Sequence, residues 1–118
     1  MTIEQRSSHG VVILDVVGRM TVEISHEPSL AYTARDLLRQ GRRHILINLE
    51  HVASIDSTGV RDIVEAYVTT TRQNGALKLL NLPGKVRSVL TVTRLLTVLE
   101  TYDTEGDAVA SFAPSTES

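Results

Sequence analysis

The chain has 118 residues, a formal net charge of -2 at pH 7 and no cysteine, so we expect one domain with a single core and no disulfide, thiol catalysis or cysteine-ligated zinc. A slightly negative chain lacks the clustered basic face that nucleic acid binding needs, and aromatic residues at 3% leave few platforms for stacking. No apolar run approaches the roughly 20 residues of a membrane span, so we expect no membrane association and a cytoplasmic location.

The first half of the chain predicts three strands and one helix. Residues 11–17 are almost uniformly apolar, as in a central strand covered on both faces, and Gly18 is expected to end them. After a loop at 19–27, Pro28 is expected to open a helix, because its missing N–H costs nothing at that position. Gly41 follows the helix as a stop signal. The expected strands are 2–5, 11–17 and 44–49, and the expected helix is 28–40.

The second half centres on a strongly periodic helix. Its apolar side chains recur at the i, i+3, i+4, i+7 spacing that predicts a core-facing stripe, made of Val60, Ile63, Val64, Tyr67, Val68 and Thr71. Three charged residues fall on the opposite side, facing water or a partner: Arg61, Asp62 and Glu65. Strands are expected at 77–80 and 98–102, a short helix after Pro83, and a terminal helix at 104–112.

This alternation of strands and helices predicts an α/β fold, with a sheet of mixed direction and helices packed on it. Right-handed crossovers would place the second and third helices along one face of the sheet. No repeat or linker divides the chain, so we expect residues 1–112 to form one domain and residues 113–118 to be a disordered tail.

Ser57 stands in the segment Ile55-Asp56-Ser57-Thr58-Gly59-Val60, between a strand-like run and the periodic helix. A serine there can cap the helix, and its hydroxyl would face out where negative charge is best tolerated. The plain alternative is an N-cap with no further role. Gly59 would let the backbone of a partner come close, although a helix start also simply tolerates glycine.

The usual signatures of catalysis and cofactor binding are missing. The four histidines, His9, His26, His44 and His51, have no metal-ligand spacing. The sequence contains no GxSxG elbow around Ser57 and no Gly-rich nucleotide-binding loop. Asp56 lacks the acidic pair with which an aspartyl-phosphate receiver holds Mg²⁺. We therefore expect no metal, no cofactor and no enzymatic activity.

Residues 45–60 resemble the signature of the STAS domain family, in which a strand and loop lead to an Asp-Ser-Ser/Thr-Gly turn and a helix. The turn here is Asp56-Ser57-Thr58-Gly59. Gly18-Arg19-Met20-Thr21 falls where the family has a Gly-x-Leu-Asp turn, and residues 77–95 look like its following strand and third helix. The resemblance covers about residues 3–112 and implies four or five strands with helices mainly on one face.

Stand-alone bacterial STAS proteins of this length are mostly anti-sigma factor antagonists. The resemblance therefore implies that an anti-sigma factor with serine kinase activity phosphorylates Ser57, in a switch turn that includes Asp56, Thr58 and Gly59. The unphosphorylated form would bind that kinase and free the sigma factor, so the protein regulates transcription, and a protein phosphatase would reset the switch. Thr21 stands where the family turn has its acidic residue, and Arg19 adds a positive charge nearby.

Two functions stay open at this point. One is the phosphorylation-controlled antagonist, whose partner surface would include Arg19, Thr21, Arg61, Asp62 and Glu65. The other is a constitutive STAS subunit of a stress-sensing or lipid-transport ATPase complex, in which Ser57 is only a helix cap. The oligomeric state is open in both.

Overall fold

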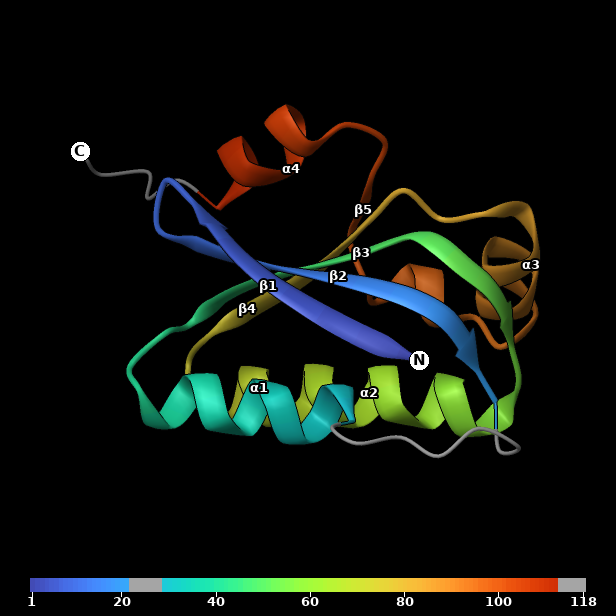
Figure 1. Cartoon of the computed structure of the whole chain (residues 1–118), viewed down its shortest axis with the longest axis horizontal. Helices are drawn as coiled ribbons and strands as arrows, with labels where there is room; N and C mark the ends of the chain where they lie inside the picture. The colour runs from blue at the N-terminus through green and yellow to red at the C-terminus, as the bar shows by residue number, and fades with distance from the viewer. Residues whose placement is uncertain (22–28, 113–118) are drawn as a thin grey trace.

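The computed structural model describes residues 1–21 and 29–112, and this part of the chain contains one five-stranded sheet in the order β1-β2-β3-β4-β5 (Figure 1). Strand β1 runs antiparallel to β2, and the other neighbouring pairs are parallel. The sheet is therefore mixed, as the sequence predicted. Its strands are β1 (Thr2–Ser8), β2 (Val11–Met20), β3 (His44–Ile55), β4 (Ala76–Leu80) and β5 (Thr101–Tyr102).

The helices lie mainly on one face of the sheet. In Figure 1, α1 and α2 run side by side below the sheet, and α4 lies above it. Buried side chains of α1, α2 and α3 belong to one large core, whereas α4 closes a smaller core on the opposite face. The helices are α1 (Leu30–Arg39), α2 (Ser57–Arg72), α3 (Gly84–Val92) and α4 (Glu105–Ser111), with a 3-10 turn η1 at Leu95–Thr97. None of the described helices is long and apolar enough to cross a membrane.

Strands β2 and β3 read as continuous apolar runs because both of their faces are covered. Alternate residues of β2 point into different cores: Val12, Leu14 and Val16 into the large one, Val11 and Ile13 into the small one. In β3, Leu46 faces the small core, and its neighbours Ile45 and Ile47 face the large one.

Several predicted strand ends were wrong. Strand β2 continues past Gly18 to Met20, because Gly18 adopts a φ of 109° and the ladder to β3 shifts between Gly18 and Arg19. A glycine in this conformation produces a bulge and does not stop the strand. Strand β3 likewise continues to Ile55. Strand β5 is limited to Thr101–Tyr102, because the 3-10 turn and the residues directly after it occupy the first part of the expected strand at 98–102.

The buried face of α2 also differs from the predicted stripe. Its fully buried residues are Gly59, Ile63, Ala66 and Thr70, whereas Val68 is 36% exposed and Thr71 lies at the surface. Small residues at two of these positions let the helix approach the sheet closely. The helix turns this narrow face to the sheet and leaves some of its β-branched residues outside.

Three predictions concern residues outside the described part of the chain. They are the helix start at Pro28, most of the expected loop at 19–27, and the disordered tail at 113–118. Helix α1 begins at Leu30, and Ser29 is its N-cap.

Candidate functional site

The segment around Ser57 lies at the carboxyl end of β2 and β3. Met20 pairs with Ile55 at the end of the ladder, and the Asp56 N–H donates a hydrogen bond of 3.2 Å to the Met20 carbonyl. Arg19 pairs with Ser54, and Thr21 follows Met20 directly. The carboxyl ends of β2 and β3, which are far apart in sequence, are thus joined at one end of the sheet.

Asp56, and not Ser57, is the N-cap of α2. Asp56 has an extended backbone, and its carboxylate accepts hydrogen bonds from the N–H groups of Thr58 at 2.9 Å and Gly59 at 3.4 Å. Ser57 is the first helical residue. A cap side chain must fold back from a non-helical residue to reach the second and third N–H groups, so Ser57 is not placed to serve as the cap. The expectation of a Ser57 cap is therefore wrong.

The Ser57 side chain is left exposed at the start of the helix. Its hydroxyl forms no hydrogen bond with any of the residues that the structure describes, and Thr58 beside it is exposed as well. Helix N-termini favour negative charge because the helix dipole is positive there. An anion added to Ser57 would meet this favourable dipole beside the Asp56 carboxylate, which already binds the N–H groups of Thr58 and Gly59.

Gly59 is buried, and the backbone next to it belongs to this same chain. A Cβ atom added to Gly59 would overlap the Met20 carbonyl oxygen and lie 2.8 Å from Cγ1 of Ile55. The glycine is thus needed for α2 to rest on the end of β2. The expectation that Gly59 admits the backbone of a partner is not supported, because Met20 already fills that space.

Asp62 points toward α1 and is half-buried, which contradicts its expected position on a solvent-facing side. Its two carboxylate oxygens accept hydrogen bonds from the N–H groups of Leu30 at 2.8 Å and Ala31 at 2.9 Å. The Ser29 hydroxyl accepts from the Tyr32 N–H at 3.1 Å. Side chains therefore accept hydrogen bonds from the first three N–H groups of α1. Asp62 of α2 binds the N–H groups of Leu30 and Ala31, and Ser29 binds that of Tyr32.

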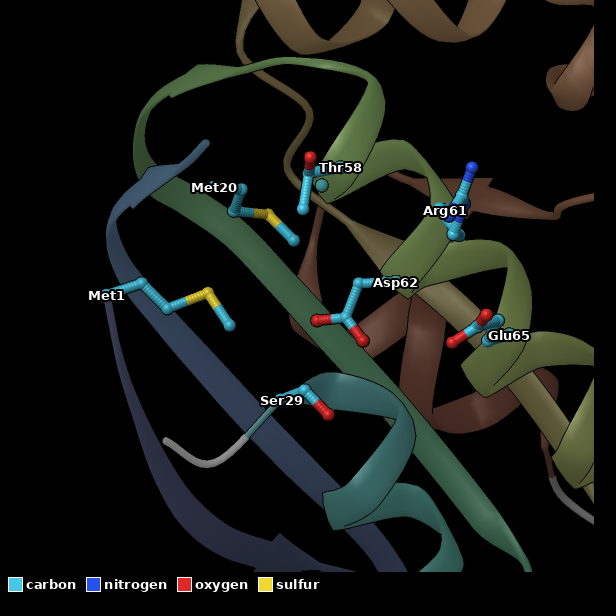
Figure 2. A pocket seen from close by; sticks show the side chains of 8 residues that line it. Met1, Met20, Ser29, Thr58, Arg61, Asp62 and Glu65 are labelled. Atoms are coloured by element: carbon cyan, nitrogen blue, oxygen red, sulfur yellow. The ribbon is translucent and has the colours of Figure 1, made fainter. Parts of the chain in front are cut away.

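A pocket of about 180 Å³ opens beside this bridge (Figure 2). Its walls come from β2, α1, α2 and the chain start, and its lining residues are Met1, Met20, Ser29, Thr58, Gly59, Arg61, Asp62 and Glu65. Arg61 and Glu65 are exposed at its rim and form no ion pair within the described residues. Five of the predicted site residues, Thr58, Gly59, Arg61, Asp62 and Glu65, thus share one hollow.

Sequence reasoning missed Ser29, Met1 and Met20 in this site. A cap signal is present for Ser29, since serine directly before an apolar helical pattern is a preferred N-cap, but the preceding Pro28 indicates an earlier helix start. For the two methionines no sequence signal existed, because only the pairing of β1 with β2 brings them together.

The charged groups with displaced pKa values lie away from this site, on the face covered by α4. The Arg6 guanidinium binds Asp15 at 2.6 Å and Glu105 at 2.7 Å, and these hydrogen bonds lower the pKa of both carboxyl groups. Asp15 also accepts a hydrogen bond from the buried Asn48 amide at 2.8 Å. Within residues 1–21 and 29–112, no group of three or more His, Asp or Glu side chains could hold a metal ion.

Comparisons with solved structures agree with this fold. Among solved structures, protein TM1081 of Thermotoga maritima is 25% identical over 93% of each chain, with a TM-score of 0.79. An anti-sigma factor antagonist from Mycobacterium paratuberculosis is 18% identical over 94% of this chain and 92% of its own, with a TM-score of 0.80. The phosphorylated form of the Bacillus cell fate determinant SpoIIAA is 18% identical over 95% of this chain and all of its own, with a TM-score of 0.71.

At these low identities the Mycobacterium and Bacillus structures show a shared fold alone. The search of curated protein sequences found no match. The model of the STAS domain family, however, matches residues 2–108. This range includes all the described strands and the turn at residues 56–59. The chain belongs to the STAS domain family.

Proposed function

We propose that this STAS domain is an anti-sigma factor antagonist controlled by phosphorylation of Ser57. The unphosphorylated protein binds an anti-sigma factor that has serine kinase activity, and this binding frees the sigma factor. The kinase phosphorylates Ser57, which ends the interaction, and a protein phosphatase restores the binding form. The observation that carries the proposal is the exposed Ser57 hydroxyl at the first position of α2, with capping assigned to Asp56.

The division of roles between Asp56 and Ser57 makes the modification compatible with the fold. Because the Ser57 hydroxyl holds no cap hydrogen bond, a phosphate can replace its proton while Asp56 still binds the N–H groups of Thr58 and Gly59. A phosphate adds about -1.5 to -2 charges, which nearly doubles the formal net charge of -2. The helix N-terminus stabilises such an anion by roughly 0.3–1 kcal/mol.

The consequence of phosphorylation then falls on the partner. A phosphate that must be desolvated inside a docked surface, or that meets a like charge, costs several kcal/mol, and about 3 kcal/mol already exceeds a hundredfold in affinity. The partner surface in this proposal surrounds Ser57 and includes Arg19, Thr21, Arg61 and Glu65. Asp62 supports that surface from beneath, through its bonds to α1.

A constitutive subunit in which Ser57 serves only as a helix cap is the weaker candidate. That candidate function requires Ser57 to be the N-cap of α2, but Asp56 occupies the cap position. In this proposal the protein is a cytoplasmic binding module that acts through its partner contacts, and not an enzyme.

The proposal is tested by incubating the protein with candidate histidine-kinase-like serine kinases and ATP, and locating phosphate by mass spectrometry. We expect phosphate on Ser57, and none in Ser57→Ala. Thr58→Ala is the matched control, because Thr58 is the neighbouring exposed hydroxyl and its loss should leave phosphorylation intact. Modification confined to Thr58 would reject the assignment of Ser57. Stable kinase binding without any phosphorylation would favour the constitutive subunit.

A further inference from the structure

The chain contains two methionines, and both line the pocket beside the start of α2. Met20 is 1% exposed at the end of β2, and Met1 is half-buried beside β2, where its Cα would lie 3.3 Å from a Cβ atom on Gly18. Figure 2 shows both thioether side chains projecting from the sheet toward Asp62. Methionine is flexible and polarisable, and it adapts its shape to apolar groups that pack against it.

The chemistry of the pocket favours an apolar group. Asp62 is the charged group at its centre, but both of its oxygens are engaged by the N–H groups of Leu30 and Ala31. The carboxylate is therefore directed to the N-terminus of α1, where the helix dipole offsets its charge. Arg61 and Glu65 stay at the rim in Figure 2, where they can meet water or polar groups.

The size of the pocket fits a single side chain better than a small-molecule ligand. Its volume of about 180 Å³ is below the range of roughly 300–1,000 Å³ that is usual for cofactor and drug-sized ligands. Protein interfaces, in contrast, concentrate their binding energy in a few residues, often aromatic, that fill small desolvated pockets.

We propose that this methionine pocket receives one aromatic side chain of the anti-sigma partner, as the anchor of the complex. The inference rests on the proposed function and adds the chemistry of the contact. Thr58 and Gly59 line the pocket and directly follow Ser57, so a partner that covers Ser57 also covers the pocket mouth. The anchor holds the unphosphorylated complex, and a phosphate on Ser57 prevents the partner from approaching closely enough to insert it.

The first test needs no partner. The protein is labelled with ¹³C at the methionine methyl groups, and the Met20 signal is assigned with Met20→Leu, a volume-conserving change. The probe is N-acetyl-phenylalanine amide at millimolar concentration, and N-acetyl-glutamate amide is its charged control. We expect the Met20 methyl signal to shift and saturate with the aromatic probe only. No shift, or equal shifts with both probes, would overturn the proposal.

The second test uses the kinase identified by the phosphorylation experiment. Glu65→Phe places a ring at the rim of the pocket and should occupy it, whereas Glu65→Gln removes the charge with nearly the same size. We expect Glu65→Phe to lower partner affinity by about tenfold or more, and Glu65→Gln by less than about threefold. Equal effects of the two variants would assign the contact to charge, and full affinity of Glu65→Phe would mean that the pocket stays empty.

These outcomes distinguish the two proposals. If no serine kinase binds or modifies the protein, the proposed function fails, but the probe titration still reports whether the pocket accepts an apolar group. If the kinase binds and the Met20 methyl signal does not change in the complex, the anchor is wrong and the antagonist function stands.

Discussion

Gly59 and Met20 are in contact at the point where α2 meets the end of β2. A Cβ atom on Gly59 would overlap the Met20 carbonyl oxygen and lie 2.7 Å from the Met20 Cβ. The same carbonyl accepts the Asp56 N–H at 3.2 Å. This contact fixes the first turn of α2, and with it Ser57, against the sheet.

Gly59→Ala should therefore lower the free energy of unfolding by about 1–3 kcal/mol, because the added methyl group displaces the Met20 backbone. Gly84→Ala is the matched control, since a Cβ atom there has no neighbour within 4 Å; its stability should stay equal or rise by a few tenths of a kcal/mol. Urea unfolding of both variants measures the difference. Equal stability of the two would mean that α2 is free to move away from β2.

Asp62→Ala should also destabilise the fold, because it leaves the N–H groups of Leu30 and Ala31 without their carboxylate partner. The expected loss is about 1–2 kcal/mol, as for other helix caps. Asp62 thus differs from an ordinary solvent-facing charge, whose replacement changes stability little. Glu65→Ala, at the exposed position one turn later, should change stability by less than about 0.5 kcal/mol. Thermal unfolding of the two variants compares a half-buried cap with a surface charge.

Ser57→Asp should keep or slightly raise stability, since an acid in the first turn favours the helix dipole, by about 0.3–1 kcal/mol at most. Arg61 lies one turn later at the i+4 position and can contribute a few tenths of a kcal/mol. The gain should therefore be smaller in Arg61→Ala. Affinity for the kinase should nevertheless fall by about tenfold, or 1.4 kcal/mol. Unchanged affinity would contradict the charge switch, whatever the melting temperature.

Charge reversal at Arg61 should weaken kinase binding with little loss of stability, because Arg61 is exposed and forms no ion pair in the described residues. Arg42 and Arg43 serve as controls at the far end of the helices, where they contact Ser7 and the Gln73 carbonyl. Their reversal should leave binding unchanged. Loss of binding at Arg42 and Arg43, but not at Arg61, would place the partner on another face. Titration calorimetry with the kinase measures all three variants.

Acid should weaken the attachment of α4 to the sheet. Arg6 lowers the pKa of Asp15 and of Glu105, so their contribution is complete above the unfolded pKa values of about 3.9 and 4.3, and it is lost as pH falls through the lower folded values. Arg6→Gln should cost about 1 kcal/mol or less at pH 7, since its side chain is 43% exposed.

The cost of Arg6→Gln should begin to shrink below about pH 4, where the carboxyl groups of the unfolded chain take up protons, and it should vanish as the folded carboxyl groups become protonated at lower pH. Arg39→Gln is the control, because its ion pair with Asp36 is exposed on both sides; it should change stability little at either pH. Urea unfolding at pH 7 and pH 3 tests the difference. A cost for Arg6→Gln that does not depend on pH would rule out the ion pairs as its cause.

The sequence predicted the elements better than their ends. Apolar runs and helical periodicity located β2, β3, β4 and α2. A strand that is covered on both faces needs apolar residues at every position, and a helix that is covered on one face needs them at helical spacing. The end of β2 could not be predicted at Gly18, since a glycine can stop a strand or form a bulge within it, and the pairing with β3 decides which occurs.

The chain by itself determined the α/β fold, the Asp56-Ser57-Thr58-Gly59 turn and the absence of cysteine chemistry, because these follow from local pattern and composition. Only the tertiary structure decided what each residue of the site does. It made Asp56 the cap and left Ser57 exposed, turned Asp62 toward α1, and placed Met1 and Met20 in one pocket. The physical reason is that hydrogen-bond partners and steric neighbours from other elements fix these roles, and sequence spacing does not encode them.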